Sequence, residues 1–211
     1  MPSPFDQSRY QVRFEWGADG LARLAPADVV VVVDVLPFST TATDAVSRGD
    51  AVALDAAAHA VSIDGAAVAA ACPPGAVVLL GCLRNASAVA RAVLAEQQRR
   101  EARTSIAVIA AGEAVARDAA APLRFAVEDH LGAGAVVDAL AALGVDHSAP
   151  EAAAACEAFR GLRGAVRHLL TASGSGQELL ERGLRDDVLH AAELDAADAV
   201  PVLRDGRFVA L

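Results

Sequence analysis

Carboxyl and hydroxyl side chains follow a strongly apolar segment near the start of the chain. Asp34 comes directly after the β-branched run 29–33, and Ser39, Thr40 and Thr41 lie at the expected start of the next helix. A carboxylate placed there can attack phosphorus or hold Mg²⁺, while helix amides and hydroxyls can bind phosphate oxygens. A simpler interpretation stays open, in which Asp34 caps a turn and Ser39 caps its own helix.

Three further groups of polar residues follow apolar segments or begin predicted helices. Each has a simple structural explanation, because Asn is a favoured helix cap, a single Glu after a strand is usually solvated, and acids at a helix start complement the helix dipole. Paired carboxylates are also the ligands that Mg²⁺ uses. The groups are Arg84 with Asn85, Gly112 with Glu113, and Glu128, Asp129 and His130 before Gly132 and Gly134.

Other catalytic patterns are weaker. No histidine lies three to five residues from another His or a Cys, which argues against zinc. No Gly-x-Ser-x-Gly elbow follows a predicted strand, although a Ser-His-Asp triad stays open. The Ser-Gly-Ser-Gly segment at 173–176 lacks the preceding strand and the Lys of a phosphate loop. We interpret it as a turn between helices or a rim of the site.

Strands and helices alternate along the first two thirds of the chain. Period-2 alternation predicts a first strand with one wet face, and continuous apolar runs predict strands buried on both faces. Ligands bind beyond the carboxyl ends of such strands, where the polar groups above are placed. The predicted strands are 10–16, 29–33, 76–80 and 106–110, and the helices are 39–49, 85–101 and 127–143.

The last third is predicted to be mostly helical and to end in a hairpin. Asp205-Gly206 supplies the positive backbone angles of a tight two-residue turn. The predicted helices are 150–170, 177–182 and 186–194, and the hairpin strands are 200–203 and 207–211. The whole pattern predicts one three-layer α/β/α domain over residues 1–211, with a mainly parallel or mixed central sheet.

Composition excludes several classes of protein. The chain has 211 residues, of which 55% are hydrophobic and 21% charged, so a disordered chain is excluded. The densest apolar run stops at Asp34, too short to cross a membrane. The net charge of -9 argues against nucleic acid as a partner, and the one basic cluster, Arg99, Arg100 and Arg103, shares its helix with acids.

The cysteines and the first residues indicate a reducing compartment. Cys72, Cys82 and Cys156 are far apart in apolar surroundings, as expected of small core residues. Residues 1–9 are polar and lack the apolar core of a secretion signal. We therefore expect a cytoplasmic protein.

Four segments, taken in this order, resemble the 2-phosphosulfolactate phosphatase (ComB-like) family. They read VVVVVDVLPFSTT from 29, GCLRNASAVA from 81, EDHLGAGAV from 128 and SGSGQELLERGLRDDV from 173, and an RFEWG opening at 13–17 adds to them. The resemblance covers most of the chain. It implies a Mg²⁺-dependent phosphatase that acts on a small anionic phosphoester such as 2-phosphosulfolactate, and a homo-oligomer, taken as a dimer.

The resemblance also implies roles for individual residues. Asp34, Glu128 and Asp129 would be catalytic. These acids would hold the metal, and Glu113, a candidate from its position after a predicted strand, would join them. The substrate-binding residues would be Ser39, Thr40, Thr41, Gly65 and Asn85, together with Arg84, a candidate from its position after another predicted strand. Whether Asp34 attacks phosphorus itself or only positions metal is left open by the residues.

Three departures from the family pattern weaken the implied activity. Pro37 stands where the family usually has Arg, and residues 62–65 replace an Asn-Gly turn with Ser-Ile-Asp-Gly. A Gly-Glu-Arg segment expected before that turn is absent, with 51–61 in its place. The alternative hypothesis is therefore a non-catalytic paralogue that binds an anionic metabolite. A third is an ordinary scaffold whose acids are helix caps.

Overall fold

A mixed seven-stranded sheet runs through the middle of the computed structural model, which describes residues 3–55, 63–116 and 122–211. Four parallel strands form one side of the sheet, and three shorter antiparallel strands extend it. In spatial order the strands are β1 (Val12–Trp16), β5 (Ile106–Ala110), β2 (Val29–Val33), β4 (Val77–Gly81), β8 (Pro201–Arg204), β9 (Arg207–Ala210) and β3 (Val52–Ala53).

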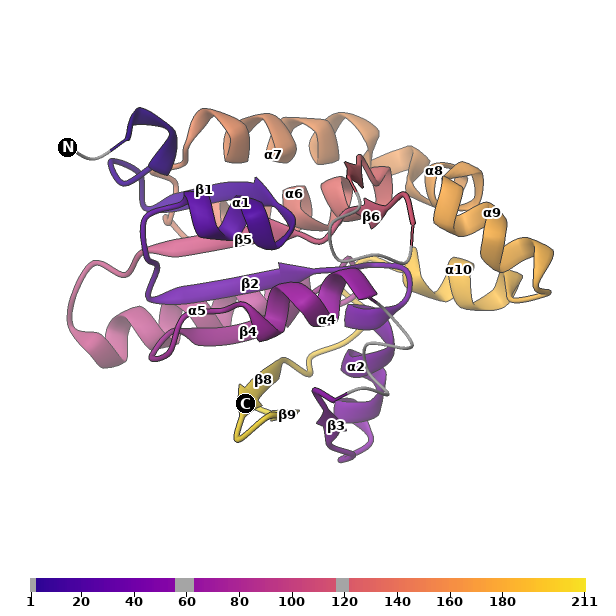
Figure 1. Ribbon diagram of the computed structural model, residues 1–211, viewed down its shortest axis with the longest axis horizontal. Coiled ribbons are helices and arrows are strands. Elements are labelled where there is room, and N and C mark those ends of the chain that lie inside the picture. Colours follow the sequence, from indigo (N-terminus) through magenta and orange to yellow (C-terminus); the bar gives the residue numbers. More distant parts are fainter. Residues whose placement is uncertain (1–2, 56–62, 117–121) are drawn as a thin grey trace.

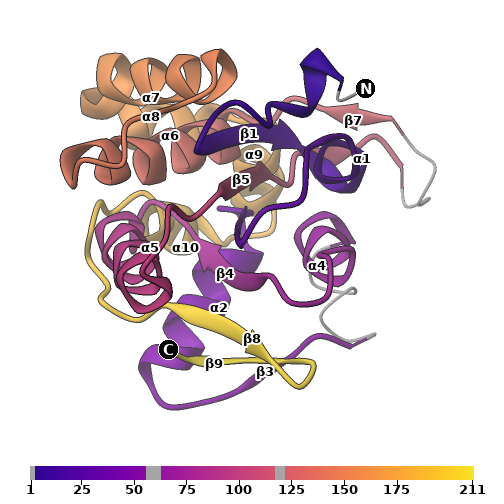
Figure 2. The same ribbon diagram turned by 90° about the vertical axis from the view of Figure 1, so that its left-hand side faces the viewer.

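Helices cover both faces of the sheet, which confirms the predicted three-layer α/β/α fold (Figures 1 and 2). All five valines of β2 are fully buried, because alternate side chains enter a different apolar core on each face. On one face lie α5 (Ala86–Arg100) and α6 (Val127–Ala142), with α7 (Pro150–Leu162) packed on α6, and on the other lie α1 (Gly17–Arg23), α2 (Phe38–Ser47) and α4 (Ile63–Ala70).

Three short helices gather at the end of the sheet toward which β1 and β2 point (Figure 1). The chain reaches them from α7 through one 3₁₀ turn, η2 (Arg163–Ala165). The loop after β5 carries a two-stranded hairpin beside the same end. These elements are α8 (Val166–Ala172), α9 (Gly174–Glu181), α10 (Arg185–Ala191), β6 (Glu113–Ala114) and β7 (Leu123–Arg124), and a 3₁₀ turn, η1 (Pro4–Asp6), precedes β1.

The structure corrects the prediction of a wet face on the first strand. Arg13 is buried, and its guanidinium donates to the carbonyls of Tyr10 (3.1 Å), Ala25 (2.7 Å) and Pro26 (3.2 Å). Ala25 and Pro26 belong to the segment that follows α1, a helix that the sequence did not predict. Helix α1 begins directly at Gly17, whose φ of +62° turns the chain away from the direction of β1.

Several helix boundaries also differ from the predictions. The expected helix over 150–170 is divided by η2, and the Ser-Gly-Ser-Gly segment begins α9 instead of only linking helices. Ser173 is its cap, because Ser173 Oγ accepts from the Gly176 N–H at 3.1 Å. Ser39 is not a cap, since α2 begins at Phe38 after Pro37.

The predicted terminal hairpin is confirmed. Asp205 (φ 49°) and Gly206 (φ 73°) form its turn, and β8 pairs with β4 in the antiparallel sense, which makes the sheet mixed. Cys82 and Cys156 are buried and Cys72 is half-buried, all three as free thiols. Among the described residues, no helix combines the length and the apolarity needed to cross a bilayer.

The close approach of α6 to α7 yields a stability prediction. A Cβ at Gly134 would lie 2.1 Å from the Ala155 carbonyl oxygen, which is backbone and cannot rotate away. Gly134→Ala should therefore lower the free energy of unfolding by about 2 kcal/mol, measured by urea denaturation. Gly161→Ala in α7 is the matched control, because no atom lies within 4 Å of its added Cβ, and it should be neutral or slightly stabilising. Equal stability of the two variants would contradict this packing.

Candidate active site

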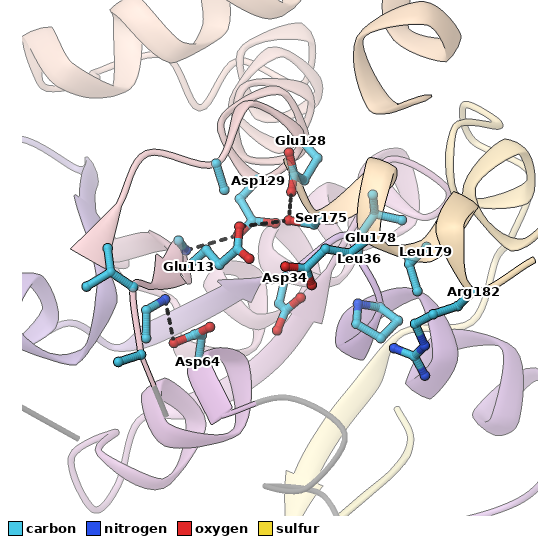
Figure 3. A pocket seen from close by; sticks show the side chains of 16 residues that line it. Asp34, Leu36, Asp64, Glu113, Glu128, Asp129, Ser175, Glu178, Leu179 and Arg182 are labelled. Carbon is cyan, nitrogen blue, oxygen red and sulfur yellow. Dashed lines mark hydrogen bonds between the residues drawn. The ribbon is translucent and has the colours of Figure 1, made fainter. Parts of the chain in front are cut away.

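A cavity of about 350 Å³ opens beyond the carboxyl ends of the parallel strands, and it is rich in carboxyl groups (Figure 3). The loops after β2 and β5, the starts of α4 and α6, and α9 all contribute to its walls. The four predicted metal ligands line this one cavity from three segments of the chain, as expected for an open α/β sheet. The polar lining residues are Asp34, Asp64, Glu113, Glu128, Asp129, Ser175, Glu178 and Arg182.

Asp34 lies at the end of β2, where the first turn of α2 fixes the surrounding loop. The Asp34 N–H donates to Ser39 Oγ (3.1 Å), and the Asp34 carbonyl accepts from the Ser39 N–H (2.8 Å). In α4, the Gly65 N–H donates to Asp34 Oδ2 at 3.1 Å. A Cβ at Gly65 would lie 2.4 Å from that oxygen, so the absence of a side chain permits this approach. Ser39 and Gly65 thus position the carboxylate without lining the cavity.

Asp129, in the first turn of α6, joins the loops that follow β2 and β5. Its Oδ1 accepts from the Val35 N–H (2.7 Å), and its Oδ2 accepts from the Gly112 N–H (3.0 Å). Burial raises the pKa of the Asp129 carboxyl well above its usual range, and the neighbouring charges of Asp34 and Glu128 raise it further. The fold therefore keeps carboxyl groups together that repel one another.

Ser175, in the first turn of α9, connects two acids that are distant in the sequence. Its hydroxyl lies 3.1 Å from Glu113 Oε2 and within hydrogen-bond distance of Glu128 Oε1. A hydroxyl has a single proton to donate, so it satisfies one of these two oxygens at a time. Arg124 pairs with Glu113 from β7, whereas Glu128 Oε2 is buried and has no hydrogen-bond partner among the described residues.

This donor set fits a hard cation such as Mg²⁺. Glu128 Oε2 is a buried oxygen without a partner among the described residues, of the kind that a metal satisfies, and the acids and Ser175 that line the cavity offer oxygen atoms. In the part of the chain that the structure describes, no three His, Cys, Asp or Glu side chains already converge as a metal site. Mg²⁺ commonly binds through one or two carboxylates and keeps several waters, so the fit does not require such a triad.

Asp64 holds the position that the family pattern gives to an Asn-Gly turn. It lies in the first turn of α4, and its Oδ1 accepts from the Ala114 N–H at 3.3 Å. Burial raises the pKa of the Asp64 carboxyl above its usual value. Ser62 and most of the segment 51–61 lie outside the described residues.

The remaining predicted substrate-binding residues lie outside the acidic cavity. Asn85 is fully buried, where its Oδ1 accepts from the Cys82 N–H (2.9 Å) and its amide donates to Thr43 Oγ1 (3.2 Å). Arg84 is also buried, at 6% exposure. Thr40 and Thr41 line a second cavity next to the acidic one.

Residues of α9 complete the site, and sequence reasoning did not assign them a role. Ser175, Glu178 and Arg182 line the acidic cavity, although the segments that carry the other acids are distant in the sequence. The available signal was the segment 173–188, which formed part of the family resemblance and included the predicted rim of the site.

The fold and the cavity define an α/β protein with an acidic cavity beyond the carboxyl ends of its parallel strands. The sequence profile of the 2-phosphosulpholactate phosphatase family matches residues 60–206, and the chain belongs to this family. It is also 39% identical over 77 residues to a probable 2-phosphosulfolactate phosphatase of Gloeobacter violaceus. That match covers 36% of this chain and 31% of the relative, so the chain spans about a third of the length of this relative.

Glu128 and Asp129 differ in their hydrogen-bond partners, so replacing each acid by its amide should change the stability in opposite directions. Glu128→Gln removes a charge that repels Asp129, and its unpartnered oxygen loses no hydrogen bond, so it should raise the free energy of unfolding in EDTA by about 1 kcal/mol. Asp129→Asn turns an amide toward a backbone N–H and should lower it by about 1–3 kcal/mol. Chemical denaturation of both variants checks this, and a loss of stability in Glu128→Gln would contradict the described electrostatics.

Proposed function

We propose that the protein is a Mg²⁺-dependent phosphatase that hydrolyses a small anionic phosphoester such as 2-phosphosulfolactate. The observation that carries the proposal is the acidic cavity, which Asp34 lines together with Glu128 and Asp129 of a distant segment, while one buried Glu128 oxygen lacks a hydrogen-bond partner among the described residues. Membership of the family and the name of the matched relative support the same activity.

In this proposal Asp34, Glu113 and Glu128 hold the metal, and Asp129 keeps the loops around it in place. Bound Mg²⁺ would offset the negative charge of the cavity and of the phosphoryl group. The overall reaction consumes one water: the bond between phosphorus and the ester oxygen breaks, a hydroxyl is added to phosphorus, and the released alcohol gains the proton. Asp34 lies among the other acids of the cavity (Figure 3), where its carboxylate would help to hold the ion that binds the phosphoryl group.

The activity assay uses release of inorganic phosphate from a panel of small phosphoesters. EDTA should abolish release, and added Mg²⁺ should restore it. Asp34→Asn should reduce kcat by on the order of 10²–10⁴-fold with an unchanged circular dichroism spectrum. Asp146→Asn is the matched control, because this exposed acid lies outside the cavity, and its kcat should equal that of the wild type.

Two outcomes would contradict the proposed activity. Phosphate release that is unaffected by EDTA would exclude the metal-dependent mechanism. Stabilisation by phosphoesters with no phosphate release from any of them would instead identify the non-catalytic paralogue that binds an anionic metabolite.

We also propose a homodimer, as the family resemblance implies, in the cytoplasm, as the cysteines and the polar first residues indicate. The exposed apolar side chains Val115, Leu123 and Phe125 cluster on and beside the β6–β7 hairpin and support an association surface there. Sedimentation should give twice the chain mass of 21.5 kDa, and Phe125→Ser should shift it toward one chain. A wild type that sediments as one chain would contradict the dimer.

A further inference from the structure

A second cavity of about 370 Å³ borders the acidic one. Four residues line both cavities, namely Leu36, Pro37, Leu179 and Arg182. Three of these shared residues are apolar, so Arg182 supplies the only charge at the boundary between the two described cavities. A ligand that extends from one cavity into the other therefore passes this guanidinium.

The second cavity differs in chemistry from the acidic one. Its walls combine apolar side chains, among them Val35, Leu184 and Ala191, with the hydroxyls of Thr40 and Thr41. This mixture suits a short organic group that carries polar atoms, and it lacks the dense cluster of carboxyl groups found next door.

The acids that line the second cavity are balanced or solvated. Asp44 is engaged by two side chains, since Arg84 Nε lies 3.5 Å from Asp44 Oδ1 and His190 Nε2 lies 2.8 Å from Asp44 Oδ2. Asp187, in the first turn of α10, is exposed to water. Neither acid therefore neutralises Arg182 through direct contact.

Arg182 is held by its backbone, while its guanidinium has no ion pair within the described residues. Its N–H bonds to the carbonyls of Glu178 (3.2 Å) and Leu179 (3.2 Å) at the end of α9. Gly183 follows with a φ of +79° and ends the helix there. Arg182 lies at the end of the acidic cavity away from Asp64 (Figure 3). Because its main chain is fixed and its guanidinium N–H donors are not used in an ion pair within the described residues, Arg182 is suited to bind a carboxylate or sulfonate.

We propose that the two cavities form one site and that Arg182 determines specificity in it. This inference rests on the proposed phosphatase activity: the acidic cavity takes the phosphoryl group, and the second cavity takes the organic half of the ester. Arg182 binds the carboxylate or sulfonate of that half, so esters with a second anionic group are preferred over esters without one.

The test compares two esters with the full chain in the presence of Mg²⁺. 2-Phosphosulfolactate carries anionic groups on its organic half, whereas p-nitrophenyl phosphate carries none. Arg182→Gln should raise KM for the first about tenfold or more, because a charge-assisted contact is lost, and should change kcat/KM for the second by less than about twofold. Arg185→Gln removes the same charge from an exposed position outside both cavities and should alter neither substrate.

Two kinetic results would overturn the proposal. An equal loss of kcat/KM with both esters would mean that Arg182 binds the phosphoryl group or is needed for folding. No loss of kcat/KM with either ester would mean that Arg182 does not contact the substrate.

A binding measurement separates this inference from the proposed activity. If the wild type releases no phosphate from any ester, the phosphatase proposal fails, and the second cavity is tested with unphosphorylated sulfolactate. This compound should raise the thermal midpoint of the wild type and of Arg185→Gln but not that of Arg182→Gln. The absence of any shift in the wild type, or an undiminished shift in Arg182→Gln, would overturn the role of Arg182.

Discussion

The site depends on one buried carboxyl group held by two backbone hydrogen bonds. Asp129 accepts from Val35 and from Gly112, which belong to the loops after β2 and β5, and it thereby fixes both loops against the start of α6. Burial in this place raises the pKa of the Asp129 carboxyl, and the neighbouring charges of Asp34 and Glu128 raise it further. The fold thus maintains an electrostatically unfavourable cluster, which is a common property of sites built for a cation.

The rest of the molecule provides the rigidity that this cluster requires. The valines of β2 are buried on both faces, so the end of the strand that carries Asp34 cannot shift without disturbing two cores. Gly65 brings α4 against the Asp34 carboxylate, and Gly134 brings α7 against α6. The helix α9 then closes the cavity from the other side, through Ser175 and Arg182.

Local sequence signals predicted the elements well, and contacts between distant segments explain the failures. The run 29–33 and the Asp205-Gly206 turn encode their structures within a few residues, and both predictions are confirmed. Arg13 was expected to face water, but the segment after the unpredicted α1 covers it. Asn85 was placed correctly before α5, yet its side chain is used up by internal hydrogen bonds that only tertiary packing creates. The meeting of Ser175 with Glu113 and Glu128 likewise has no local signal in the sequence.

The central claim is that the carboxyl groups of this cavity surround a divalent cation. Crystals grown with Mn²⁺ as a substitute for Mg²⁺ give a direct measurement, because the anomalous signal of manganese locates the ion without reference to activity. We predict a single strong anomalous peak within ligand distance of the Glu128 and Asp34 carboxylates, with Glu128 Oε2 as one of its donors. A cavity without a peak, or a peak at a different acidic surface of the protein, would contradict the claim.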